Sequence, residues 1–197
     1  MKMKMLAAAA IAVLASAVFA QGTSKVAFKE DFEKTKVNSQ GKLVISSWYS
    51  PSKLKEHCEV TITRKKLDVF AGKFACKYSN MNDKQQIYML HETGVIKVDP
   101  AKEKIEVSVQ AKGTGYFLIA LVFYADGKVL RSAGIAPIAG KQALPTKKKP
   151  FADADWTTCY GQIAKIPADA KNCKVAIFVM PKSEIYLDDI EVKLVQK

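Results

Sequence analysis

The chain has 197 residues, of which 49% are hydrophobic, 9% aromatic and 25% charged. These proportions are typical of a folded globular domain and exclude wholesale disorder, collagen-like repeats and a multi-span membrane protein. Lys and Arg number 31 against 19 Asp and Glu, giving a formal net charge of +12, and the two histidines offer little material for a histidine-based catalytic centre. The length predicts a single domain with its own core.

Residues 1–20 have the composition of a secretory signal peptide. Lys2 and Lys4 precede the apolar run Leu6–Ala20, which ends in Ala-Val-Phe-Ala. A basic start, a short apolar stretch and a small-residue exit are typical of such signals, and the run is shorter than the ~20 residues of a membrane-spanning helix. We therefore expect cleavage near Ala20 and a secreted, periplasmic or cell-surface protein without a membrane span. An uncleaved N-terminal anchor is the alternative.

Residues 21–197 are predicted to form one all-β domain. Strict alternation of apolar and polar residues in Lys104–Ala111 predicts a strand with one buried and one solvated side. Residues 133–150 contain three prolines and the basic run 147–149, and they are predicted to form a long surface loop. Short segments rich in Val, Ile, Tyr, Phe and Thr are separated by turn residues, which favours a β-sandwich or barrel; they are Glu59–Thr63, Phe74–Tyr78, Ile105–Ala111, Tyr116–Tyr124, Tyr160–Ile166, Lys174–Met180 and Ile185–Leu194.

The four cysteines, Cys58, Cys76, Cys159 and Cys173, form an even set in a chain that we expect to be exported. An oxidising compartment predicts two disulfides. Three pairings are possible, and we favour Cys58–Cys76 with Cys159–Cys173 because each pair flanks one turn region. The spacings Cys-x-x-Cys and Cys-x-x-His do not occur, which disfavours a zinc site, and neither histidine suggests a partner for a catalytic thiol.

Several short motifs occur in a characteristic order. Asp31-Phe32-Glu33, Trp48 and Gly-Lys-Phe-Ala at 72–75 are followed by Trp156, by Pro-x-x-Ala at 167–170 and by Ile-Tyr-Leu-Asp-Asp-Ile at 185–190. Over residues 28–194 this order resembles the carbohydrate-binding modules of families 4, 9 and 22, which belong to the galactose-binding-like superfamily. The resemblance implies a jelly-roll β-sandwich of two antiparallel sheets. The chain departs from the pattern in its four cysteines, its positive charge and its Pro-rich loop.

The same resemblance implies a structural Ca²⁺ that ties the first strand to the last. Its ligands would be Glu33 and Asp188, assisted by backbone carbonyls near Gly72 and Lys73. Calcium accepts six to eight oxygen ligands, backbone carbonyls among them. The alternatives are that the two carboxylates pair with lysines or cap turns, or that Lys73 itself occupies the site.

A sugar-binding face is predicted on the segment Tyr116–Tyr124, because both of its sides are apolar. One side, with Phe117, Ile119, Leu121 and Phe123, suits the core, and the other carries tyrosines at both ends. Saccharide rings stack on such side chains, and a concave sheet would hold them in a cleft. The candidate carbohydrate-binding residues are Tyr116 and Tyr124, with Tyr88 (and His91 beside it) on the same face and Trp48 and Tyr49 on a loop. Burial in the core is the alternative for each aromatic residue.

The predicted partner is therefore a poly- or oligosaccharide, and the positive charge adds acidic saccharides to the candidates. Export and the lack of a nucleic-acid-binding motif disfavour nucleic acid. A glycosidase needs two opposed carboxylates about 5–10 Å apart, and the sequence has no pair with that signature, so we expect no enzymatic activity. A structural or adhesive cell-envelope protein, which uses the jelly roll for protein contacts, is the alternative.

Overall fold

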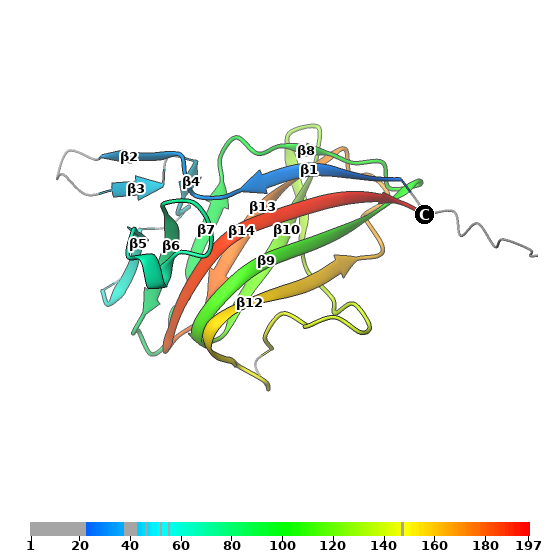
Figure 1. Ribbon diagram of the computed structural model, residues 1–197. Coiled ribbons are helices and arrows are strands. Elements are labelled where there is room, and N and C mark those ends of the chain that lie inside the picture. The colour runs from blue at the N-terminus through cyan, green and yellow to red at the C-terminus, as the bar shows by residue number, and fades with distance from the viewer. Residues whose placement is uncertain (1–22, 38–42, 46, 52, 55, 147) are drawn as a thin grey trace, which may run out of the picture.

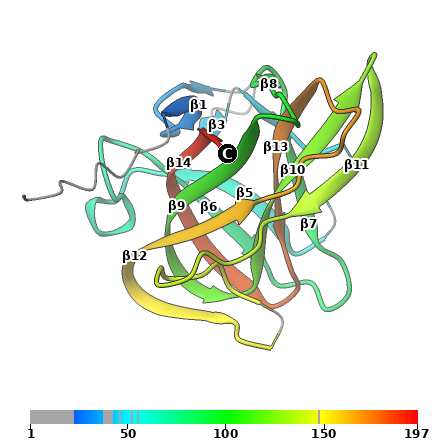
Figure 2. The same ribbon diagram turned by 90° about the vertical axis from the view of Figure 1, so that its right-hand side faces the viewer.

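The computed structural model describes residues 23–37, 43–45, 47–51, 53–54, 56–146 and 148–197. The predicted signal peptide and one lysine of the basic run, Lys147, lie outside these residues. The described chain folds into two antiparallel sheets that pack face to face, with a small third sheet beside them (Figures 1 and 2). This arrangement confirms the predicted β-sandwich. No helix in the described part of the chain is long and apolar enough to cross a bilayer.

The first sheet has the strand order β12-β9-β14-β6-β5, and β1 also pairs with β14. β14 pairs with β9 along one edge, whereas its other edge pairs with β6 and then with β1. The strands of this sheet are β1 (Ser24–Glu30), β5 (Cys58–Thr63), β6 (Ala75–Asn80), β9 (Glu103–Gly115), β12 (Phe151–Ile163) and β14 (Ser183–Gln196). A short 3-10 helix, Lys66–Asp68, lies between β5 and β6. The first and last strands of the domain are thus neighbours.

The second sheet has the strand order β11-β10-β13-β7-β4, and β8 also pairs with β13. Its strands are β4 (Trp48–Tyr49), β7 (Ile87–His91), β8 (Ile96–Lys97), β10 (Phe117–Ala125), β11 (Lys128–Gly134) and β13 (Asn172–Val179). β2 (Thr35–Val37) and β3 (Leu43–Ile45) form a separate antiparallel pair. Each of the seven predicted strand segments overlaps an observed strand; the short strands β2, β3, β4 and β8 were not predicted, nor were β1, β7 and β11.

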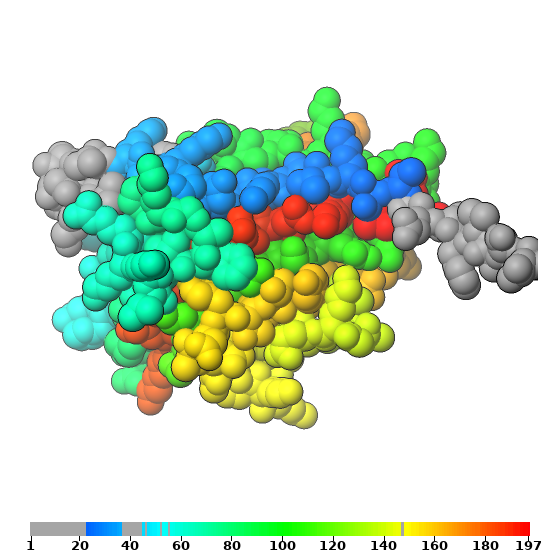
Figure 3. Space-filling model, in the orientation of Figure 1, coloured from blue at the N-terminus to red at the C-terminus, as the bar shows by residue number. Residues whose placement is uncertain are grey.

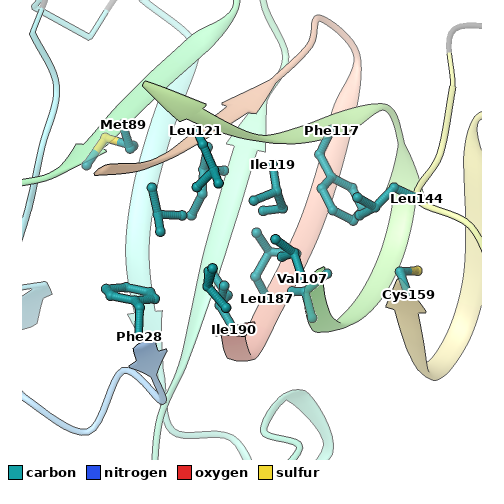
Figure 4. Close-up of a cluster of buried hydrophobic side chains, with 14 of the residues drawn as sticks. Phe28, Met89, Val107, Phe117, Ile119, Leu121, Leu144, Cys159, Leu187 and Ile190 are labelled. Carbon is teal, nitrogen blue, oxygen red and sulfur yellow. The ribbon is translucent and has the colours of Figure 1, made fainter. Parts of the chain in front are cut away.

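The core lies between the two sheets and is built by alternation. In β9 the predicted inward residues Ile105, Val107, Val109 and Ala111 are all buried. They meet the inward side of β10, whose predicted core residues are likewise fully buried: Phe117, Ile119, Leu121 and Phe123. Figure 4 shows side chains from both sheets pointing toward one another. Each such Leu, Ile or Phe contributes about 1.5–3 kcal/mol by leaving water, which makes this core the main source of stability.

The cysteines form no disulfide in this structure, in contrast to the prediction. Cys58 lies opposite Asn80 on the β5–β6 ladder, and Cys76 lies opposite Ile62. Four residues of strand, about 13 Å, therefore separate Cys58 from Cys76 along the ladder, whereas a disulfide requires Cα atoms within about 7 Å. Cys159 belongs to the edge strand of the first sheet and Cys173 to a central strand of the second. Burial raises the pKa of Cys159 to about 11 and that of Cys173 to about 12, as expected of structural thiols.

Candidate functional site

The outward side of the second sheet carries several aromatic residues at matching positions of neighbouring strands. One ladder row runs Tyr88, Phe178, Leu118 across β7, β13 and β10. The next row runs from Tyr49 through Leu90, Ala176 and Ala120 to Gly134 of β11. The small side chains of Ala176 and Ala120 in the middle of that row leave the surface lower there than at the neighbouring aromatic row. Tyr124 lies near the far end of β10, opposite Asn172. We call the surface formed by Tyr49, Tyr88, Tyr124 and Phe178 the aromatic face.

The rings of the aromatic face are ordered by contact with one another. Tyr88 and Phe178 stack in parallel, with 4.6 Å between ring centroids and an interplanar angle of 5°. Burial raises the pKa of Tyr88, and the neighbouring phenols of Tyr124 and Tyr49 raise it further. The pKa of Tyr124 is raised by burial and then by Tyr49. Three of the predicted sugar-binding tyrosines therefore lie close enough to influence one another electrostatically.

The aromatic face is accessible to solvent. Tyr49 is 41% exposed, and Tyr88, Tyr124 and Phe178 are half-buried, above a small buried cluster that contains Leu90, Ala120, Val122 and Ala176. The long loop 135–150 does not cover this face: Ala136 and Gln142 bond to Gln162 and Tyr160 of β12, in the other sheet. The loop therefore leaves the tyrosines of the aromatic face uncovered.

A polar cleft of about 350 Å³ adjoins the aromatic face at Tyr88. Lys53, Lys84, Gln85 and Gln86 line it with hydrogen-bonding side chains. An aromatic ring next to amide and ammonium groups can stack on the apolar face of a sugar while the polar groups bind its hydroxyls. This combination of a flat apolar surface and convergent polar groups is typical of ligand sites.

Tyr116 lies apart from the other predicted tyrosines. It precedes β10, and its amide nitrogen donates a 3.0 Å hydrogen bond to Ser183 Oγ. Eight residues of extended chain, about 27 Å, separate it from Tyr124 at the other end of the strand. The two tyrosines chosen as the ends of one face are thus too far apart to contact one sugar unit, although Tyr116 lies on the same side of β10.

The structure corrects the prediction that Trp48 is a sugar platform. Trp48 is only 6% exposed, and its indole nitrogen donates a 2.9 Å hydrogen bond to Glu30 Oε2. Its ring packs edge-on against His91, with 5.0 Å between centroids. His91 is also buried, so it does not line the aromatic face. The reason is register: Trp48 and Tyr49 are successive residues of β4, so Trp48 points inward and Tyr49 outward.

Glu30, Trp48 and His91 form a buried polar network that joins the two sheets. His91 Nδ1 accepts a 2.7 Å hydrogen bond from the Gly94 amide, which leaves the proton of the neutral ring on Nε2, 3.3 Å from Glu30 Oε2. The Phe32 amide also donates to Glu30, at 2.8 Å. Burial pushes the pKa of Glu30 upward, but the bonds from His91, Phe32 and Trp48 outweigh it and the pKa is lowered. The network fixes β4, and with it Tyr49, against β1.

Glu33 and Asp188, the predicted calcium ligands, both reach the loop before β6. Glu33 Oε1 accepts hydrogen bonds from the amides of Lys73 (2.7 Å) and Phe74 (3.0 Å). Asp188 Oδ2 accepts from the amides of Phe70 (3.2 Å) and Ala71 (3.1 Å). The structure thus brings together the two carboxylates and the loop that the resemblance singled out. The two carboxylates meet this loop at the point along β14 where pairing with β6 ends and pairing with β1 begins.

The charge at this position is only partly compensated. Asp188 is buried, and burial raises its pKa to about 6 despite the hydrogen bonds from backbone amides. A cation would offset this penalty, and both carboxylates supply the hard oxygen ligands that calcium prefers. Backbone amides rather than carbonyls face the two side chains here, so calcium would compete with these amides for the carboxylate oxygens. The described residues contain no cluster of three or more His, Cys, Asp or Glu side chains that could hold a metal.

The sequence interpretation missed Phe178 as a site residue. In β13 the inward residues Val175, Ile177 and Val179 are fully buried, which places Phe178 on the opposite side. The same period-2 alternation was legible in the sequence, since Phe178 lies between two β-branched residues of an apolar strand. What it could not show is that Phe178 lies opposite Tyr88, because that depends on strand pairing.

No protein-family model matches the sequence, and no curated protein sequence matches it. Solved structures do match in fold. The CBM22-1 xylan-binding domain of Xyn10C from Paenibacillus barcinonensis matches with a TM-score of 0.51 at 12% identity, over 89% of this chain and 98% of that one. The CBM22-1-GH10 modules of endo-1,4-beta-D-xylanase 10B from Clostridium thermocellum match with a TM-score of 0.54 at 15% identity, over 85% of this chain and 28% of that chain.

The enzymatically active domain of tailspike protein 4 from bacteriophage CBA120 is also similar, with a TM-score of 0.55 at 13% identity. That match covers 76% of this chain but only 20% of the tailspike chain. At these identities the likeness concerns the fold alone, and it confirms the jelly-roll β-sandwich of two antiparallel sheets that the motif resemblance implied.

Proposed function

We propose that this protein is a non-catalytic carbohydrate-binding protein that holds a poly- or oligosaccharide on the aromatic face. The observation that carries the proposal is the half-buried stacked pair Tyr88 and Phe178, with the exposed Tyr49 beside it, next to a polar cleft. The sugar rings would stack on the tyrosines, and Gln85, Gln86 and the lysines of the cleft would bind hydroxyls. One of the structural neighbours is a xylan-binding domain and another is a pair of modules complexed with xylohexaose, which supports a sugar ligand.

The aromatic face also supports this function over the cell-envelope alternative. A domain that used the jelly roll only for protein contacts would bury its tyrosines and would lack an exposed aromatic platform. The tyrosines are instead partly exposed, and their orientation is fixed by stacking rather than by a covering segment. The proposal includes export, because the first twenty residues have the pattern of a signal peptide.

The test is binding of the purified protein to xylan and other neutral polysaccharides. We expect saturable binding that Tyr88→Ala weakens by about 2 kcal/mol, roughly thirtyfold, as for a central contact residue. Tyr49→Ala and Tyr124→Ala should weaken it less. Tyr186→Ala is the matched control, because Tyr186 is a tyrosine on the outward side of the other sheet. A folded protein that binds no glycan would refute the proposal and favour the envelope function.

We also propose that Ca²⁺ binds at Glu33 and Asp188 and acts structurally. The partly uncompensated charge of buried Asp188 supports this, as does the convergence of both carboxylates on one loop. Calcium would raise the melting temperature of the EDTA-treated protein, and Asp188→Asn would abolish the shift, whereas Asp153→Asn would leave it intact. An unchanged melting temperature in the wild type at millimolar calcium would refute the site.

A further inference from the structure

A second hollow lies on the opposite side of the molecule, over the first sheet. The loop Arg64–Phe74, which we call the basic loop, surrounds a depression of about 620 Å³, compared with about 350 Å³ for the cleft at Tyr88. Arg64, Lys66, Phe70 and Lys73 line it. In Figure 3 this segment (cyan to teal) stands out toward the viewer on the same side of the molecule as β14 and β12.

The charges of the basic loop are not neutralised by neighbouring acids. Among the described residues, no carboxylate oxygen lies within 4 Å of the side-chain nitrogens of Arg64, Lys66 or Lys73, whereas eight lysines outside the loop each pair with a carboxylate. The acid within the loop, Asp68, already pairs with Lys112 at 2.9 Å. The two carboxylates that reach the loop from outside, Glu33 and Asp188, accept its backbone amides and do not pair with its cationic side chains. The hollow is therefore electropositive.

The hollow also offers an aromatic surface. Phe70 is 45% exposed, and its ring packs edge-on against Trp156, with 5.9 Å between centroids and an interplanar angle of 63°. An edge-on contact holds a ring in place while leaving the remainder of its surface free for a ligand. The backbone of the loop is itself fixed, because its amides donate to Asp188 and Glu33. Such a pre-organised surface loses little entropy when a ligand binds.

We propose that this hollow is a second saccharide site, specific for sugars that carry carboxylates, such as uronates. Phe70 would contact the apolar face of the sugar ring, while Arg64, with Lys66 and Lys73, would bind the carboxylate. Arginine suits this role because its planar guanidinium can donate two parallel hydrogen bonds to one carboxylate. The site is independent of the aromatic face, since it lies on the other sheet and shares none of its residues.

The test compares two charge-neutralising triple variants. Arg64→Gln/Lys66→Gln/Lys73→Gln removes the cations of the basic loop. Lys36→Gln/Lys97→Gln/Lys165→Gln removes the same charge from exposed positions elsewhere. The probe is sodium polygalacturonate, a linear uronate polymer, in calorimetric titrations at physiological salt, with xylan as the neutral counterpart. We expect the loop variant to lose about tenfold or more in affinity for polygalacturonate and the control to lose less than about threefold, as for scattered surface charges.

Phe70→Ala distinguishes a sugar site from simple charge attraction. We expect it to weaken polygalacturonate binding several-fold without altering net charge, and to leave xylan binding unchanged. Equal losses in both triple variants, or no loss in Phe70→Ala, would overturn the proposal and leave only non-specific attraction. Loss of polygalacturonate binding in Tyr88→Ala but not in the loop variant would place the acidic sugar on the aromatic face instead. Failure of xylan to bind would count against the proposed function alone.

Discussion

The outward sides of the two sheets each carry a tyrosine in a ladder row, and the two have different neighbours. Tyr186 of β14 lies between Lys77 and Lys112, whose ammonium groups are each 5.4 Å from its ring centroid. Tyr88 of β7 instead stacks on Phe178 beside a polar cleft. The identity of a residue does not decide its role; its cross-strand neighbours do. A tyrosine with cations on both sides stabilises a charged surface, whereas one beside another ring extends an apolar surface.

Both surfaces belong to one sandwich, whose two sheets are joined by the buried network of Glu30, Trp48 and His91. Removing the Glu30 carboxylate tests how much this network stabilises the fold. Glu30→Ala would leave the Trp48 indole, the Phe32 amide and His91 without their acceptor in a buried setting. We expect a loss of about 3–5 kcal/mol in the free energy of unfolding, measured with urea. Glu59→Ala, at an exposed position, is the control and should cost under about 0.5 kcal/mol. A loss of under about 1 kcal/mol for Glu30→Ala would show that the network does not fasten the sheets.

The stability that Glu30 contributes should also depend on pH. The pKa of Glu30 is lower in the folded protein than the 4.5 of a free glutamate side chain, so its ionised form stabilises the fold. This contribution is complete above pH 4.5 and is lost as the pH falls through the folded pKa. Unfolding free energies of the wild type and Glu30→Gln should therefore converge as the pH falls below about 4.5. A difference that stays constant down to about pH 3 would contradict the assigned pKa direction.

Alanine substitutions at two glycines with similar backbone conformations measure how tightly the basic loop packs over the first sheet. Gly72 has φ +71°, and a Cβ there would overlap the Glu33 carboxylate. Gly127 has φ +78°, with no atom within 4 Å of the added Cβ. Gly127→Ala should cost about 1 kcal/mol of backbone strain, and Gly72→Ala about 1–2 kcal/mol more. Thermal or urea unfolding of both variants measures the difference, and equal costs would mean that the Glu33 contact with the loop contributes nothing.

The smallest expected effects test the comparison most directly. A double-mutant cycle on Tyr88 and Phe178 should give a coupling of about 1 kcal/mol, as for stacked aromatic pairs. A matched cycle on Lys77 and Glu184, which pair at 3.0 Å on the other sheet, should give no more than about 0.5 kcal/mol. Adding about 0.5 M NaCl should reduce only the second coupling. A salt-sensitive coupling between Tyr88 and Phe178 would contradict the description of the aromatic face.

The local sequence context located some of the predicted site residues correctly and others wrongly. Tyr49, Tyr88 and Tyr124 were chosen from apolar or loop context, and they do share one surface. Trp48 was chosen by the same reasoning as its neighbour Tyr49, and it is buried because successive strand residues point to opposite sides. The disulfide prediction was wrong for a related reason. The spacing of cysteines in the sequence does not determine strand register, and Cys58 and Cys76 are four ladder positions apart.

The sequence by itself determined that the chain forms an all-β domain, because period-2 alternation and turn residues are local signals that survive in any pairing of strands. The order of its short motifs, through the resemblance that it carries, implied the sandwich. The sequence also determined the charge and the motifs at Glu33, at 72–75 and at Asp188. Only the tertiary structure decided which residues share a surface: Tyr88 with Phe178, Glu30 with Trp48 and His91, and Phe70 with Trp156. These contacts join strands far apart in the chain, and a shift of one residue in register would exchange their inward and outward sides.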